Sequence, residues 1–155
     1  MSMNTVPERL AALRAAMAAN GVAVYLIPVG DPHASEYLPD HYTSLTWFSG
    51  FHGENSTFVV TRTESALWAD GRYFVQAEKE IAGTEIKLQR MGEPGVPTVE
   101  EYCAAALAEG ETLGLCGLTA ATALVGKLEK ALAKKGASIK TLNLEDELWT
   151  EGRPA

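Results

Sequence analysis

The sequence predicts an α/β protein of three layers, in which helices cover both faces of a mixed, mostly parallel sheet of about five or six strands. Segments with helical spacing of apolar residues alternate along the chain with short β-rich runs, a pattern typical of a sheet covered on both faces. Residues 22–28 are continuously apolar, as in a strand buried on both sides. Two β-rich runs flanking residues 62–64 predict a hairpin, which makes the sheet mixed.

Length and composition favour one ordinary globular domain. The chain has 155 residues, of which 46% are apolar and 21% charged, so a single domain is expected. A net charge of −7 without a run of basic residues argues against nucleic acid or a membrane as a partner. The first residues lack the apolar core of a signal peptide, and no apolar stretch approaches the ~18 residues of a membrane span. We therefore expect a cytoplasmic protein.

The first helix is predicted over residues 6–20. Thr5 and Glu8 have the spacing of a capping box, and Pro7 stands in the first turn, both of which favour a helix start. Gly21 follows the last apolar position and is a typical C-terminal stop.

The other elements are predicted from the same signals, which are apolar spacing, capping residues and glycine stops. Residues 30–55 are expected to be irregular apart from short helical turns near 35–38 and 46–49. A second capping box, Thr98 with Glu101, opens one later helix. The expected strands cover residues 22–28, 56–61, 65–69, 85–91, 112–117 and 138–142, and the expected helices cover residues 72–82, 98–108, 119–135 and a last turn at 144–149.

A polar corner, Asp70-Gly71-Arg72, stands between an expected strand and an expected helix. Asp70 occupies the position that would cap the first turn of that helix. Gly71 permits a tight turn, and Arg72 can reach a neighbouring carboxylate or carbonyl. Catalysis by Arg72 would require an acid, base or nucleophile beside it, and none is apparent. We interpret the corner as a structural joint.

The chain offers weak signals for metal or nucleophilic chemistry. His33, His41 and His52 are spaced 8 and 11 residues apart in expected loop, whereas a metal site needs ligands that converge. We therefore assign no metal ligand, and a small metalloenzyme is the least favoured alternative. Cys103 and Cys116 fall on apolar segments and are interpreted as small core residues.

Five segments, in order, resemble the N-terminal domain of Xaa-Pro aminopeptidases in the creatinase/prolidase superfamily. They are DPHASEYLP (31–39), WFSGFHGENSTFVVT (47–61), LWADGRYFVQAEKEI (67–81), MGEPGVPTVEEY (91–102) and DELWTEGRPA (146–155). The resemblance implies a mixed sheet with helices on both sides. It also implies that catalysis belongs to a C-terminal domain, where two Asp, one His and two Glu hold two metal ions, usually manganese.

That catalytic domain is absent from these residues, so the resemblance makes residues 1–155 a single non-catalytic domain with no cofactor or peptidase activity of its own. Its implied partners are the C-terminal catalytic domain of the same protein and a second subunit of a full-length homodimer. Its implied roles are subunit association and shaping of access to an active site.

The resemblance and the types of residue present together predict which residues have structural, interface or loop roles. Structural or interface roles are expected for Asp70, Gly71, Arg72, Trp47, Gly50 and Phe51. A loop that borders the substrate path or contacts another domain is expected to use His33, Glu36, Tyr37, His52 and Asn55. Aromatic side chains suit such an exposed surface because they bury a large area at low entropic cost.

The sequence departs from the family pattern in this same loop. The family often has arginine just before the position of Trp47, where this chain has Thr43-Ser44-Leu45-Thr46. Residues 53–56 read Gly-Glu-Asn-Ser where Gly-Ser-Ala-Gly is usual, which puts substrate contacts carried over to this loop in doubt. The alternative function is a stand-alone module that binds a peptide or small ligand through residues 31–56.

Overall fold

A computed structural model describes residues 5–28, 44–51, 56–69, 71–115 and 122–142, together with Leu144 and Leu148. The helical turns expected at 35–38 and 144–149 fall wholly or mostly outside these residues, as do the three histidines, Asp70 and Cys116. Within the described part of the chain, no helix is both long and apolar enough to cross a bilayer.

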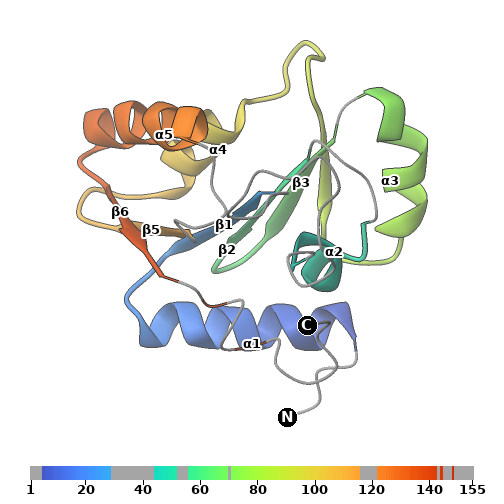
Figure 1. Cartoon of the computed structure of the whole chain (residues 1–155), viewed down its shortest axis with the longest axis horizontal. Helices are drawn as coiled ribbons and strands as arrows, with labels where there is room; N and C mark the ends of the chain where they lie inside the picture. The colour runs from blue at the N-terminus through green and yellow to red at the C-terminus, as the bar shows by residue number, and fades with distance from the viewer. Residues whose placement is uncertain are drawn as a thin grey trace.

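The described residues form one sheet with the strand order β4-β3-β2-β1-β5-β6 (Figure 1). The strands are β1 (Val24–Pro28), β2 (Thr57–Thr61), β3 (Ser65–Ala69), β4 (Lys87–Arg90), β5 (Thr112–Leu115) and β6 (Ser138–Thr141). β2 is antiparallel to β1 and β3, and the remaining neighbours pair in parallel. The predicted mixed, mostly parallel sheet is confirmed.

Helices cover both faces of this sheet. Figure 1 shows α4 (Val99–Ala106) and α5 (Thr122–Lys135) on one side and α1 (Val6–Ala19) on the other. The core beneath α1 also takes in residues of α2 (Ser44–Ser49) and α3 (Phe74–Glu80). Side chains of β1 alternate between the two cores: Tyr25 and Ile27 face α1, whereas Val24 and Leu26 face α4 and α5. The three-layer prediction is confirmed.

Two helices begin where the capping residues predicted. The Thr98 hydroxyl accepts a hydrogen bond from the Glu101 amide at 3.2 Å, and the Glu101 carboxylate accepts one from the Thr98 amide at 3.0 Å. At α1, the Thr5 hydroxyl accepts from the Glu8 amide at 3.3 Å and donates to the Glu8 carboxylate at 2.7 Å. These bonds satisfy backbone amides that the first helical turn leaves open.

The helix after β3 begins later than predicted. Residues Gly71–Tyr73 form a 3₁₀ turn, η2, and the α-helix starts only at Phe74. Tyr73 occupies the N-cap position of α3 and makes no side-chain capping bond. The α-helix that was expected to start at residue 72, with Asp70 as its cap, therefore starts at Phe74 instead, and the predicted start is wrong. Asp70 itself lies outside the described residues.

A polar cluster joins α1 to the sheet beneath it. Arg14 of α1 donates through Nε to the Thr61 carbonyl at 2.8 Å and pairs with both carboxylate oxygens of Glu85, at 2.8 and 2.6 Å. The Ser65 hydroxyl donates to the same carboxylate at 3.1 Å. The Arg14 hydrogen bond, aided by its charge and by Ser65, holds the pKa of Glu85 below its usual range although burial opposes this.

The substitution Glu85→Gln is expected to lower the free energy of unfolding at pH 7 by up to about 1 kcal/mol, because the pair is partly exposed and screened. A lowered folded-state pKa gives stabilisation above the unfolded carboxyl pKa of about 4.3. This stabilisation is lost as the pH falls through the folded-state value. Urea unfolding from pH 7 to pH 3 should show the deficit shrink, with Glu129→Gln as control. A deficit that persists at pH 3 would contradict the linkage.

Candidate functional site

Strand pairing brings six strand ends to one edge of the sheet. Pro28 pairs with Thr57, Thr57 with Trp68, Ala69 with Arg90, and Leu26 with Leu115. Leu115 also pairs with Thr141. The carboxyl ends of β1, β3, β4, β5 and β6 therefore lie on the same side of the sheet as the amino end of β2. We call this side of the sheet the carboxyl edge. In α/β proteins ligands bind outside this edge of the sheet.

Most of the predicted site residues belong to segments joined to the carboxyl edge. Residues 29–43 follow Pro28, residues 52–55 precede Ser56, and Asp70 follows Ala69. These segments carry His33, Glu36, Tyr37, His52, Asn55 and Asp70. All six residues lie outside the described part of the chain, so their contacts with a substrate or another domain stay predictions.

The described part of the predicted loop packs into the protein. Phe48 and Phe51 have no exposed surface, and the Phe51 ring meets Tyr73 edge to face with centroids 6.0 Å apart. Trp47 is partly buried: the Arg9 guanidinium lies 4.4 Å from its ring centroid and donates to its carbonyl at 2.8 Å. Both phenylalanines belong to the core cluster that also holds residues of α1 and α3. Burial of Phe51 is compatible with the structural or interface role expected for it, which stays a prediction.

Gly50 and the corner beyond β3 have structural features that fit a joint. Gly50 has φ +81°, a conformation that side chains with a Cβ rarely adopt. Gly71 and Arg72 are exposed, and the Arg72 guanidinium lies 5.4 Å from the Tyr73 ring centroid. Since Tyr73 contacts Phe51, the corner is linked through aromatic rings to the core. Its role as a joint stays a prediction.

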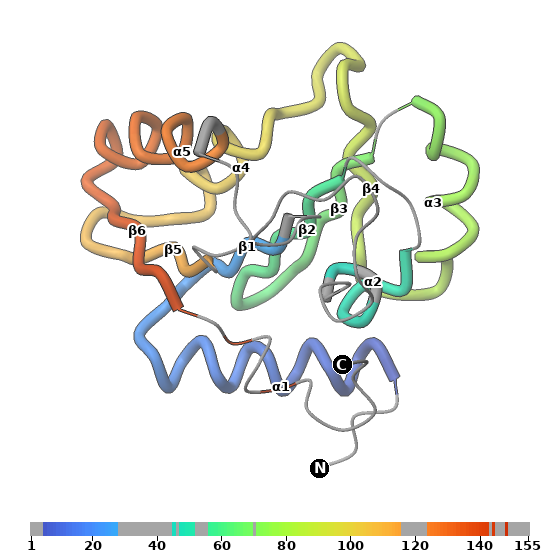
Figure 2. The backbone as a smooth tube through the Cα atoms, viewed as in Figure 1, coloured from blue at the N-terminus to red at the C-terminus, as the bar shows by residue number. Residues whose placement is uncertain are grey.

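A groove of about 540 Å³ at the carboxyl edge was not predicted. We call it the Trp68 groove, and it is lined by Thr57, Trp68, residues 91–93 and 96–100, Leu124 and Lys127. Figure 2 shows the loop that forms one side of it, rising from the end of β4 and returning to α4. The sequence signal for this groove was the apolar residue Met91 beside the turn residues Gly-Glu-Pro-Gly. That signal predicts a loop with an apolar side chain, but it does not show which other segments pack opposite the loop.

The Trp68 groove has a fixed floor. The Trp68 indole N–H donates to the Pro97 carbonyl at 2.9 Å, which ties β3 to the loop. The Trp68 ring also meets the Tyr102 ring edge to face, with centroids 5.0 Å apart. Trp68 is 2% exposed, whereas Met91 at the side is 41% exposed. The groove is therefore preformed, with an accessible apolar wall.

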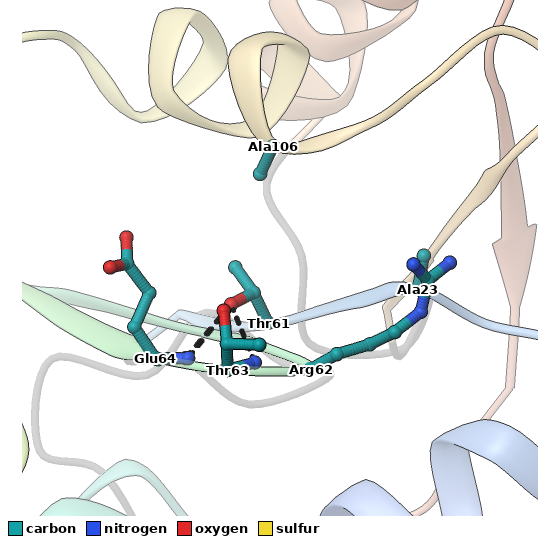
Figure 3. Close-up of a pocket in the computed structure, with 6 residues that line it drawn as sticks. All are labelled: Ala23, Thr61, Arg62, Thr63, Glu64 and Ala106. Carbon is teal, nitrogen blue, oxygen red and sulfur yellow. Dashed lines mark hydrogen bonds between the residues drawn. The ribbon is translucent and has the colours of Figure 1, made fainter.

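A second pocket, of about 380 Å³, lies at the opposite edge beside the β2–β3 turn (Figure 3). There the Thr61 hydroxyl accepts from the backbone amides of Thr63 and Glu64 at 3.3 and 3.0 Å, while Arg62 and Glu64 extend to opposite sides. Arg62 pairs with Glu111, and Glu64 pairs with Lys87 and accepts from the Tyr102 hydroxyl. Hydrogen bonds from Lys87 and then Tyr102 lower the pKa of Glu64. These charges are satisfied internally, so we assign them to the scaffold.

The described residues offer no metal centre. Nowhere in ranges 5–28, 44–51, 56–69, 71–115 and 122–142 do three His, Cys, Asp or Glu side chains come together as a group that could hold an ion. Cys103 has no exposed surface, and burial raises the pKa of its thiol to about 12. A thiol that stays protonated is a poor nucleophile, and the prediction that Cys103 is a core residue is confirmed.

Comparison with known proteins shows which proteins this chain and its fold are similar to. Residues 9–148 match the family described as creatinase/prolidase N-terminal domain. The chain is 40% identical to "Aminopeptidase P2" of Arabidopsis thaliana over 96% of this chain and 22% of that protein. It superposes with a TM-score of 0.88 at 34% identity on the X-prolyl aminopeptidase of Caenorhabditis elegans, "a cytosolic enzyme with a di-nuclear active site", covering 98% of this chain and 26% of that one.

The same fold has been seen in a separate domain. The N-terminal domain of the cytoplasmic peptidase PepQ from Mycobacterium tuberculosis matches with a TM-score of 0.65 at 23% identity, over 91% of this chain and 98% of that one. By contrast, the chain spans about a quarter of the length of the curated relatives it matches.

Proposed function

The chain belongs to the creatinase/prolidase N-terminal domain family, and from that premise we propose that it is the non-catalytic N-terminal domain of an Xaa-Pro aminopeptidase. One observation carries this proposal: almost the whole chain aligns with only about a quarter of aminopeptidase P relatives. In the proposal, a further part of the protein removes the residue before proline, and the complete enzyme is a cytoplasmic homodimer.

The donor chemistry of the described residues supports a non-catalytic role. A dinuclear centre needs several carboxylates or imidazoles on a rigid cradle, and the described residues bring no such group together. The two metal ions, proposed to be manganese, would then bind in the remaining part of the protein. This chain would contribute to subunit association and to the shape of the active-site entrance, through the segments joined to the carboxyl edge.

The proposal predicts no turnover of an Xaa-Pro peptide by the 155-residue chain in the presence of Mn²⁺. The C. elegans enzyme is the positive control under the same conditions. A second measurement uses a chimera in which this chain replaces the matching segment of the C. elegans enzyme, and the chimera is expected to hydrolyse the peptide as a folded protein. Turnover by the isolated chain, or a folded but inactive chimera, would reject the assignment.

A further inference from the structure

The Trp68 groove combines an apolar wall with charged side chains that no described residue pairs. Elsewhere in the described part of the chain, some surface charges form ion pairs: Arg14 with Glu85, Arg62 with Glu111, Lys87 with Glu64 and Arg90 with Glu78. Glu93, Glu100 and Lys127 also line the groove, yet their side chains make no hydrogen bond or ion pair with any described residue. Two carboxylates against one ammonium give the rim a net negative charge.

We propose that the Trp68 groove binds a segment of another protein that carries a large apolar side chain with a basic side chain beside it. The apolar side chain would lie against Met91 and Leu124, over the floor made by Trp68. The basic side chain would face Glu93 and Glu100. Complementary charge selects the partner and its orientation, while the buried apolar contact supplies affinity.

Size and position favour a short polypeptide segment. A volume of about 540 Å³ falls within the range of sites that enclose a small ligand or a few side chains. The charged groups stand on separate elements, Glu93 in the loop after β4, Glu100 in α4 and Lys127 in α5. A segment with several side chains can meet charges placed on separate elements. This inference does not depend on the proposed peptidase role.

The first test is an NMR titration of the ¹⁵N-labelled 155-residue chain with the capped peptide acetyl-Ala-Arg-Leu-Arg-Ala-amide. We expect shifts confined to the Trp68 indole N–H and to the amides of residues 91–100 and 124–127. The charge-reversed peptide acetyl-Ala-Glu-Leu-Glu-Ala-amide should bind at least about fivefold more weakly, because it loses the contacts with Glu93 and Glu100 and adds like-charge repulsion. The peptide with Gly in place of Leu should also bind at least about fivefold more weakly, because it loses the buried apolar contact.

A matched pair of variants separates the groove from the overall charge. Glu93→Gln with Glu100→Gln removes two charges at the groove, whereas Glu109→Gln with Glu129→Gln removes two exposed charges outside its lining. The first pair should weaken peptide binding about fivefold, and the second should leave it unchanged. Amide spectra of both variants report whether they are folded.

Several outcomes would overturn the proposal. One is that the peptide shifts no NMR signals, or shifts signals spread over the whole chain. Another is that the charge-reversed peptide binds as tightly as the arginine peptide. A third is that the two variant pairs change peptide binding equally. Leucinamide binding as tightly as the peptide would identify a small-molecule site instead. Groove shifts that grow with the concentration of the chain alone would identify a second copy as the occupant.

Discussion

The substitution Phe51→Ala is expected to lower the free energy of unfolding by about 3–5 kcal/mol, as for large core aromatics. Phe51 has no exposed surface and belongs to the core that also holds Leu10, Phe48 and Ala77. Removing the ring leaves a cavity in that core and deletes the edge-to-face contact with Tyr73. Urea unfolding followed by far-UV circular dichroism measures the loss.

The control for this prediction is Val75→Ala on α3. Val75 is 66% exposed, so its truncation should change stability by less than about 0.5 kcal/mol. A loss below about 1 kcal/mol for Phe51→Ala would contradict the buried position. Phe51 would then be better explained as a residue that meets another domain or subunit.

The substitution Gly114→Ala is expected to destabilise the protein by about 1–3 kcal/mol through overpacking. A Cβ at position 114 would lie 2.8 Å from Leu142 Cδ2, 3.0 Å from Val22 Cγ1 and 3.1 Å from Tyr25 Cδ2. The Leu142 methyl can rotate aside, but the Tyr25 ring is fully buried. Its hydroxyl donates to the Leu142 carbonyl at 3.3 Å and accepts from the Leu144 amide at 3.2 Å. The ring therefore has little freedom to move.

The matched glycine is Gly126 in α5, where an added Cβ meets nothing within 4 Å. Gly126→Ala should raise the free energy of unfolding by up to about 1 kcal/mol, since alanine favours the helix. Thermal and urea unfolding of the two variants should therefore shift in opposite directions. The same shift in both would show that the space around position 114 does not limit the side chain.

The fold was predictable from the sequence where local chemistry determines structure. Thr5 with Glu8 and Thr98 with Glu101 marked helix starts because their side chains bond amides only three residues away. The hairpin of β2 and β3 followed from two β-rich runs joined by three residues. Each of these features depends on residues that are close in sequence, so no knowledge of tertiary packing was needed.

The candidate site was less predictable because it depends on packing between distant segments. The Trp68 groove brings together the ends of β2 and β3, the loop after β4 and the first turns of α5. The burial of Phe48 and Phe51 depends on α1, which lies far away in sequence. Likewise, the late start of α3 reflects a 3₁₀ turn whose Tyr73 is anchored by Phe51.

The central place of β1 has a consequence for biosynthesis. Val24 pairs on one side with Thr61 and on the other with Leu113. The ribosome therefore releases β1 long before the partner for its second side exists, and closing so large a loop is entropically slow. Until β5 has been translated, one flank of the most apolar strand keeps open backbone donors and acceptors. During that interval the open flank can pair with another chain.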